Sequence, residues 1–298
     1  AIVSDGQTLV VSEDHLWTVR KSHRSDGGVV TNSTRELYKR QLSVNLKPKL
    51  PISGIAEYPD RNLPVPPYVM GAWLGDGASA NGTMAAHPND AAHIRARFEA
   101  DGVPTTDTKW DMTLGTRGLM VRLRDAGVLG KKHIPEIYMT SSPAQRLALI
   151  QGLMDTDGDV TVDGKCTFNT SDEKMAKDFA SLINSFGAKA RVTSRMPKRW
   201  GKYQPKISYR VMFKMANAAS LPRKAERCRA KKGNLARTIT FTPTGMIEET
   251  QCLQVANEDG LFLAGRGYIV THNTKSEFAS FLFPAWFLGK FPDKKVIQ

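Results

Sequence analysis

The sequence is short of cysteine, of long apolar runs and of acidic side chains, and each shortage excludes a class of protein. Three cysteines, Cys166, Cys228 and Cys252, form neither a disulfide framework nor a metal-type pair, which fits a reducing cytosol. No apolar stretch approaches the roughly 20 residues of a membrane-spanning helix, and no signal peptide is visible, so we expect no membrane partner. Only 29 Asp and Glu stand against 42 Lys and Arg, leaving a formal charge of +13. This balance favours a polyanionic partner, nucleic acid first.

The size of the chain allows more than one domain. Its 298 residues, 41% of them hydrophobic, are enough for two units with their own cores. The sequence does not begin with Met, residues 1–11 indicate a hairpin around Asp5-Gly6, and residues 294–298 look like a strand cut off partway. We therefore expect a fragment at both ends, or one piece of a split protein.

The pattern of the chain changes twice. Residues 1–55 show short alternating strands, as in an all-β module, and a proline-rich linker follows. From residue 68 to about residue 215, amphipathic helices alternate with strands, and the helical spacing is clearest at residues 142–154 and 173–186. Strand patterns then return at residues 238–241, 252–255, 261–264 and 268–270. A mixed helical domain is thus predicted to interrupt a β module.

Two segments about 80 residues apart can bring carboxylates together. Residues 69–77 (Val-Met-Gly-Ala-Trp-Leu-Gly-Asp-Gly) and 150–158 (Ile-Gln-Gly-Leu-Met-Asp-Thr-Asp-Gly) each have the pattern of an apolar helix with a small third residue, ending in an acid and a glycine. Small residues let two helices approach closely, which would place Asp76 beside Asp157. Two carboxylates there can hold Mg²⁺, which orients water and offsets charge on a phosphodiester under attack.

Each segment has a plainer alternative. The first is compatible with a buried helix that ends at a glycine turn. The second hints at an EF-hand loop, but its glycine stands two places early and Cys166 occupies the position where a Glu is needed.

The paired segments resemble the twin motifs of LAGLIDADG homing endonucleases, the first degenerate and the second close. The resemblance implies an αββαββα-type domain in which Asp76 and Asp157 are the Mg²⁺ ligands. Its strands would lie in the major groove of a long, asymmetric double-stranded DNA target. We assign that role to strands within residues 165–169, 189–195 and 206–214, whose Lys and Arg would neutralise phosphates and contact guanine edges.

The tripeptide His272-Asn273-Thr274 carries a different chemistry. Asn can cyclise onto its own backbone carbonyl and break the peptide bond after it, if a neighbour such as His272 polarises that carbonyl or protonates the leaving amine. The Thr274 hydroxyl can then serve as an acyl acceptor. Most such tripeptides are inert surface turns, so the argument depends on other positions.

Those positions resemble an intein over residues 1–273. The segment Ser12-Glu-Asp-His15-Leu-Trp17 matches the intein block whose His contacts the upstream scissile amide. Trp17, Cys252 and Thr271 resemble the Trp-Cys-Thr signature of class 3 inteins. In that class the internal Cys attacks the upstream junction, the acyl group moves to the hydroxyl after the intein, and Asn cyclisation releases the intein. A thiolate suits this attack, although a buried Cys in a strand is ordinarily a small hydrophobe and a lone His is usually structural.

The intein resemblance therefore implies a set of splicing residues that need no cofactor. Ser12 and Trp17 would support the site, and the chemistry would belong to Cys252, His15, Thr271, His272, Asn273 and Thr274. The first intein block has no counterpart in the chain, so we expect either that the sequence is truncated or that a second polypeptide, an upstream split-intein fragment, supplies this block. Full splicing would require the missing part. Alone, the chain could at most cleave after Asn273.

Residues 274–298 resemble the start of a phage terminase large subunit, after its phosphate-binding loop. There Lys275 would reach ATP phosphates and Ser276 would hold Mg²⁺ once splicing has restored the loop. The implied location is the cytoplasm of a phage-infected bacterial cell.

The sequence as a whole predicts an α+β chain in which an all-β Hint (horseshoe) splicing domain is interrupted by a LAGLIDADG endonuclease. The expected parts are residues 1–56 and 223–273 for splicing, 57–222 for the endonuclease and 274–298 for the terminase. Two other hypotheses stay open. The chain could be a free-standing LAGLIDADG DNA endonuclease without splicing, or a catalytically silent DNA-binding relic of such an endonuclease.

Overall fold

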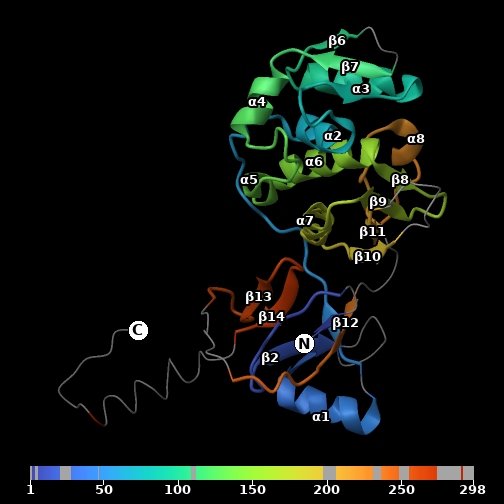
Figure 1. Ribbon diagram of the computed structural model, residues 1–298. Helices are drawn as coiled ribbons and strands as arrows, with labels where there is room; N and C mark the ends of the chain where they lie inside the picture. Colours follow the sequence, from blue (N-terminus) through green and yellow to red (C-terminus); the bar gives the residue numbers. More distant parts are fainter. Residues whose placement is uncertain are drawn as a thin grey trace. The chain divides into compact units, whose positions relative to one another are not determined.

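The computed structural model describes residues 2–3, 6–20, 28–45, 47–108, 112–196, 206–230, 236–247, 255–273 and 290 (Figure 1). These residues belong to two compact units. Unit 1 is built from Ala1–Ser53 and Asn234–Gln298, and unit 2 from Gly54–Gly233. Within the described parts of the chain, every helix is too short or too polar to span a bilayer.

Unit 1 consists mainly of short antiparallel strand pairs around a small core. Its sheets have the strand orders β1-β12-β4, β2-β3 and β13-β14. The core is formed by Trp17, Val19, Leu37, Leu50, Ile239, Phe241 and Ile269. The elements are β1 (Ile2–Val3), β2 (Leu16–Arg20), β3 (Val29–Ser33), α1 (Thr34–Val44), β4 (Lys49–Pro51), β12 (Ala236–Thr240), β13 (Leu261–Ala264) and β14 (Ile269–His272).

Two features of unit 1 correct the sequence reading. The first strand, β1, lies antiparallel to β12, more than 200 residues later, whereas the sequence predicted a hairpin within residues 1–11; Asp5 of that hairpin lies outside the described residues. The predicted all-β stretch also contains the helix α1. Ser33 caps this helix by accepting a hydrogen bond from the Glu36 backbone N–H, and the Glu36 carboxylate accepts one from the Ser33 N–H in return. This reciprocal capping box fixes the helix start.

Unit 2 contains two successive groups of helices and strands, each with its own sheet. Its sheets have the orders β5-β7-β6 and β10-β11-β9-β8. From α6 onward the order is helix, two strands, helix, two strands, helix, as predicted. The first half contains α2 (Pro67–Asp76), β5 (Met84–Ala85), α3 (Pro88–Ala100), β6 (Thr105–Asp107), β7 (Thr113–Thr116), α4 (Leu119–Asp125) and α5 (Glu136–Met139). The second half contains α6 (Pro143–Thr156), β8 (Gly158–Val160), β9 (Cys166–Thr170), α7 (Glu173–Asn184), β10 (Arg191–Arg195), β11 (Ser208–Phe213) and α8 (Pro222–Ala225).

The boundaries of unit 2 extend past the predicted ones at both ends. The Ala56 N–H donates to the Ser185 carbonyl at 2.8 Å, and buried Arg146 donates to the Ala56 carbonyl. At the other end, buried Lys224 donates to carbonyls at the end of α6. Residues 223–230, which the sequence reading gave to the splicing module, therefore belong with unit 2.

Candidate functional sites

The two helices that lead to the predicted acids, α2 and α6, lie side by side and pack against each other (Figure 1). A Cβ atom on Gly152 would lie 2.3 Å from the Tyr68 carbonyl oxygen, and one on Gly71 would lie 2.3 Å from the Leu149 carbonyl oxygen. Distances this short are possible only for glycine, so the backbones of α2 and α6 touch at this crossing. The small third residue of each motif thus makes the close approach that the sequence predicted.

This crossing brings Asp76 and Asp157 into electrostatic contact. Asp76 is the last residue of α2, and Asp157 caps the end of α6. Burial, and then the charge of Asp76, raise the pKa of Asp157 to about 6. Burial also raises the pKa of Asp76. Both residues still reach solvent. A pair of partly desolvated carboxylates, one of which is kept from ionising by the charge of the other, forms a site to which a cation is attracted.

Two lysines that sequence reasoning missed complete this site. The Lys132 ammonium donates to the Leu74 and Gly75 carbonyls at 3.1 and 3.0 Å, at the end of α2. Lys224, only 5% exposed, donates to the Met154, Asp155 and Gly158 carbonyls at 2.7–2.8 Å, at the end of α6. Both charges lower the pKa of each acid and oppose the effect of burial. No local pattern marks either lysine, because each reaches its helix from a distant segment.

The other acid of the second motif has a different environment. Asp155 is 3% exposed and accepts hydrogen bonds from Tyr68, Ser220 and Leu221. Its carboxylate is therefore saturated by protein donors. This arrangement supports the exclusion of an EF-hand loop.

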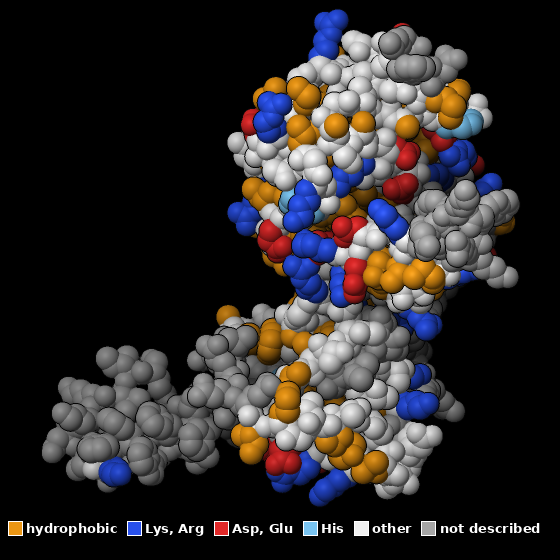
Figure 2. All heavy atoms as spheres, viewed as in Figure 1, with side chains coloured by type: hydrophobic (Ala, Val, Ile, Leu, Met, Phe, Trp, Pro, Cys, Tyr) orange, Lys and Arg blue, Asp and Glu red, His pale blue; other side chains and the backbone are white. Residues whose placement is uncertain are grey.

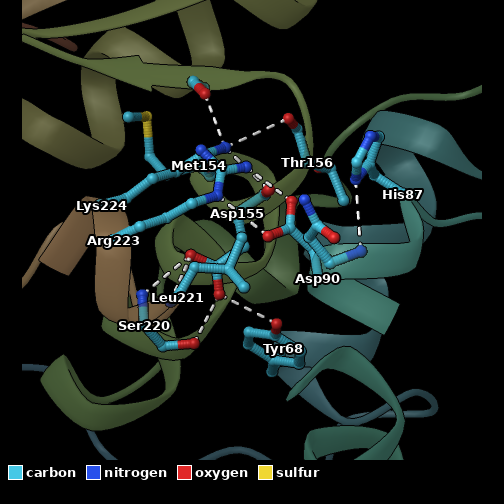
Figure 3. A network of polar contacts seen from close by, with 12 residues as sticks. Tyr68, His87, Asp90, Met154, Asp155, Thr156, Ser220, Leu221, Arg223 and Lys224 are labelled. Carbon is cyan, nitrogen blue, oxygen red and sulfur yellow. Dashed lines mark hydrogen bonds and ion pairs between the residues drawn. The ribbon is translucent and has the colours of Figure 1, made fainter. Parts of the chain in front are cut away.

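A polar cavity of about 310 Å³ lies next to Asp76. Its walls include Thr156 of α6 and the ion pair in which Arg223 donates to both oxygens of Asp90, at 2.9 and 2.5 Å. Figure 3 shows this ion pair close to Asp155 and Lys224. Within the described residues, no cluster of three or more His, Cys, Asp or Glu side chains could hold a metal ion by itself.

The strands predicted to face DNA form one sheet with an inner and an outer face. Phe168 and Phe213 point inward and pack on Phe179 of α7. Asn169, Arg210 and Thr193 are cross-strand neighbours on the opposite face. The outer face also carries the exposed Arg191 and Arg195. Figure 2 shows further Lys and Arg side chains over the visible face of unit 2, with Asp and Glu side chains between them.

In unit 1 the structure brings His15, Trp17 and Thr271 together. His15 Nε2 lies 2.5 Å from the Thr271 hydroxyl oxygen on β14, and its ring makes an edge contact with Trp17 at 5.0 Å between centroids. Buried Trp17 donates to the Thr34 hydroxyl at 2.9 Å, which in turn donates to the His15 carbonyl at 3.1 Å. The Ser12 carbonyl accepts from the His15 N–H at 3.3 Å. Burial, then the charge of His272, lowers the pKa of His15 to about 4, so its imidazole is neutral at pH 7.

His272 lies against the predicted cleavage point. Its Nδ1 is 2.5 Å from the backbone carbonyl oxygen of Asn273, which belongs to the peptide bond that cyclisation would break. The Asn273 N–H donates to the Gly260 carbonyl at 2.8 Å, and the residue is 7% exposed. Gly260 has a φ of +65°, and a Cβ there would come within 3.1 Å of both the His272 ring and the Asn273 side chain. Glycine thus makes room for this pair.

Four predicted site residues lie outside the described part of the chain: Cys252, Thr274, Lys275 and Ser276. Their roles stay predictions.

Comparison with known proteins identifies part of unit 2. A family model described as a LAGLIDADG-like domain matches residues 144–221, which include Asp155, Asp157 and the sheet of β8–β11. The chain therefore contains a LAGLIDADG-like domain.

The chain also resembles a curated relative along most of its length. The replicative DNA helicase DnaB of Mycobacterium intracellulare is 33% identical over 300 residues, covering 91% of this chain and 49% of the helicase. The chain spans about half the length of this relative.

Several solved structures of the homing endonuclease I-DmoI show a weaker likeness. Its mesophilic variants share 14% identity at a TM-score of 0.37, over 52% of this chain and 90% of theirs. Its complexes with DNA and Mn or Ca share 15% and 12% identity at TM-scores of 0.36, over 52% and 55% of this chain and 92% and 95% of theirs. Scores at this level carry no argument about shared geometry.

Proposed function

We propose that unit 2 is a metal-dependent endonuclease that cleaves double-stranded DNA. The observation that carries the proposal is the meeting of Asp76 and Asp157 at the ends of two helices in contact, within a LAGLIDADG-like domain. The exposed arginines on the sheet of β8–β11 and the formal charge of +13 support a polyanionic substrate.

The two carboxylates fit a hard divalent cation such as Mg²⁺. This ion keeps several waters and is usually bound by one or two carboxylates together with substrate phosphates, so two protein ligands are enough. Burial and the charge of Asp76 raise the pKa of Asp157, and a bound cation would favour the ionised form of both carboxylates. When bound, Mg²⁺ supplies charge stabilisation and lowers the pKa of a coordinated water.

The remaining residues position the reacting groups. In the proposed reaction a water oxygen bonds to phosphorus and releases one proton to solvent, one ester P–O bond breaks, and the leaving oxygen takes a proton from solvent. Lys132 and Lys224 place two fixed positive charges beside the acids, where negative charge builds up on the phosphoryl oxygens. Arg191, Arg195 and Arg210 would hold the duplex through its phosphates and base edges.

Nicking of supercoiled plasmid carrying the natural insertion site tests this proposal. We expect Mg²⁺-dependent cleavage that Asp76→Asn or Asp157→Asn each reduces by at least about 100-fold, with DNA affinity retained. Asp163→Asn, at an exposed acid in the same half of unit 2, is the matched control. DNA binding without cleavage by the wild-type chain would instead identify a silent DNA-binding relic.

We propose a second activity for unit 1, cleavage of the peptide bond after Asn273 as the last step of intein splicing. The contact between His272 Nδ1 and the Asn273 carbonyl oxygen favours it. Donation of a proton in that hydrogen bond withdraws electrons from the carbonyl carbon. The Asn273 side-chain nitrogen attacks that carbon, the bond to Thr274 breaks, and the released amine gains a proton while the side-chain amide loses one.

The other splicing residues keep their predicted roles in this proposal. Cys252 would attack the upstream junction, Thr274 would accept the acyl group, and neutral His15, held by Trp17 and Thr271, would act at the upstream amide. The fold of unit 1 would be the Hint domain.

The match to the helicase supports an insert within a larger host. The alignment with the helicase covers 91% of the chain, which is more than the length of either unit. It therefore includes residues of both unit 1 and unit 2. A LAGLIDADG-like domain inside a helicase polypeptide is the arrangement expected of an intein. The terminase host rests on residues 274–298 and stays a prediction, and a helicase host is its alternative.

Intact-mass spectrometry of the expressed chain tests the second activity. We expect a product ending at Asn273, lost in Asn273→Ala and slowed at least about tenfold in His272→Ala. Glu258→Gln, at an exposed residue of the same unit, should cleave as wild type does. An uncleaved chain under every condition, with the upstream fragment added as well, would leave the free-standing endonuclease as the better account.

A further inference from the structure

The two acids of the second motif, Asp155 and Asp157, are separated by one residue and face different partners. Asp157 lies with Asp76, whereas Asp155 points toward the segment that leads into α8 (Figure 3). Each Asp155 oxygen accepts two hydrogen bonds. Oδ1 accepts from the Ser220 and Leu221 N–H groups at 2.8 and 3.0 Å, and Oδ2 accepts from the Ser220 and Tyr68 hydroxyls at 2.5 and 2.9 Å.

These bonds fix the start of the segment that carries Lys224. Leu221 caps α8, and its carbonyl accepts from the Lys224 N–H at 2.9 Å. Arg223, between them, is tied to Asp90 of α3 by two charge-assisted bonds. The backbone on one side of Lys224 is therefore held by Asp155 and the neighbouring side chain by Asp90.

The Lys224 ammonium reaches carbonyls that surround Asp157 in the sequence, those of Thr156 at 3.4 Å and Gly158 at 2.7 Å. Four backbone carbonyls lie within reach of the Lys224 ammonium. The hydrogen bonds that it makes therefore depend on where the backbone of Lys224 is held. In the first half of unit 2, Leu74 stands in place of Asp155, and Lys132 lies over the Trp73 ring at 5.1 Å. The end of α2 therefore forms without an acid at the position that corresponds to Asp155 in α6.

We propose that Asp155 is a positioning residue for the proposed DNA cleavage: by anchoring residues 220–221 it holds the Lys224 ammonium at the Asp157 end of α6. This inference rests on the proposed nuclease function only in what it predicts for the rate of DNA cleavage. The placement of Lys224 is a property of the protein without DNA or metal and can be measured separately.

Amine labelling measures that placement. The full chain, free of DNA and metal, is acetylated briefly with a small acylating reagent, and peptide mass spectrometry follows each lysine. We expect Asp155→Asn to raise the labelling rate of Lys224 by about tenfold or more at a temperature where the variant is folded. Lys132, held by the other helix, and exposed Lys177 should label as in wild type. Lys224 protection equal to wild type in folded Asp155→Asn would overturn the proposal.

The kinetic arm separates positioning from stability. At saturating DNA and Mg²⁺, we expect Asp155→Asn to lower the cleavage rate by about 10- to 100-fold with DNA affinity unchanged within about twofold. In a Lys224→Met background, Asp155→Asn should lower the cleavage rate little further. Each substitution removes the same feature, the Lys224 ammonium held at the end of α6. Independent, multiplicative losses would contradict a shared role. If the wild-type chain does not cleave DNA, the nuclease proposal fails while labelling still decides the placement.

A milder variant covers the case in which Asp155→Asn does not fold. Ser220→Ala removes one hydroxyl bond to Asp155 and leaves the Ser220 N–H bond in place. We expect a smaller rise in Lys224 labelling, about two- to fivefold. No rise in folded Ser220→Ala would count against the proposal in the same way.

Discussion

Asp157 reaches solvent, but it holds its proton to a higher pH than an ordinary aspartate because desolvation and the charge of Asp76 disfavour its ionised form. The same two causes make the site attractive to a cation and unfavourable to the protein without one. A residue with the proposed metal-binding role would in this way reduce stability when the cation is absent.

This conflict gives a prediction for metal-free protein. The pKa of Asp157 rises from 3.8 to about 6 on folding, so unit 2 loses stability as the pH increases through that range. We expect Asp157→Asn, in chelator, to be more stable than wild type at pH 7 by about 1–2 kcal/mol, after discounting for solvent screening. The two should converge near pH 4, where both carry an uncharged group. Denaturant unfolding at both pH values measures this, and exposed Asp159→Asn should show no such gain.

His15 has the opposite pH dependence. Its pKa falls from 6.5 to about 4 on folding, so the stability it contributes is complete above pH 6.5 and is lost as the pH falls toward 4. We expect unit 1 of the wild type to lose about 1–2 kcal/mol more than His15→Gln does between pH 7 and 4.5. Unfolding followed by Trp17 fluorescence reports it. Parallel pH profiles of the two proteins would refute the buried neutral imidazole.

At the scale of elements, the contact between α2 and α6 decides whether the acids meet. The Cβ of Gly152→Ala would lie 2.3 Å from the Tyr68 carbonyl oxygen and 2.6 Å from the Ala72 nitrogen, both backbone atoms that cannot turn aside. We expect a loss of about 1–3 kcal/mol in stability and of about 100-fold in DNA nicking, with both acids still present. Gly54→Ala, with open space around its Cβ, is the control. Wild-type nicking by Gly152→Ala would show that close packing is dispensable.

The elements also show how far the sequence could be interpreted. Periodic apolar residues predicted α6 and α7, and the paired glycines and acids predicted their own meeting, because these signals are local. The helix α1 was missed although Ser33 and Glu36 form a capping box, since the strand-like residues around it dominated the reading. The pairing of β1 with β12 and the reach of Lys132 and Lys224 to the helix ends join distant segments, and no single-sequence pattern encodes such contacts.

At the scale of the molecule, the two units have separate cores. Trp17 and Ile239 belong to one hydrophobic cluster and Phe98 and Phe179 to another, and no residue is shared between them. The proposed chemistry divides in the same way, with Asn273 in unit 1 and Asp157 in unit 2. A core defect in one unit should therefore leave the activity of the other intact.

A pair of core substitutions tests this division. Both Trp17 and Phe179 are fully buried, and truncation to Ala costs about 3–5 kcal/mol at such positions. We expect Trp17→Ala to abolish cleavage after Asn273 and to leave Mg²⁺-dependent nicking within about twofold of wild type. Phe179→Ala should do the reverse, and calorimetry should show each variant shifting a different unfolding transition. Loss of both activities in either variant would contradict this division, as would a shift of the same unfolding transition in both variants. Either result would mean that the two units unfold as one cooperative body, because damage to one core would then destabilise the other unit.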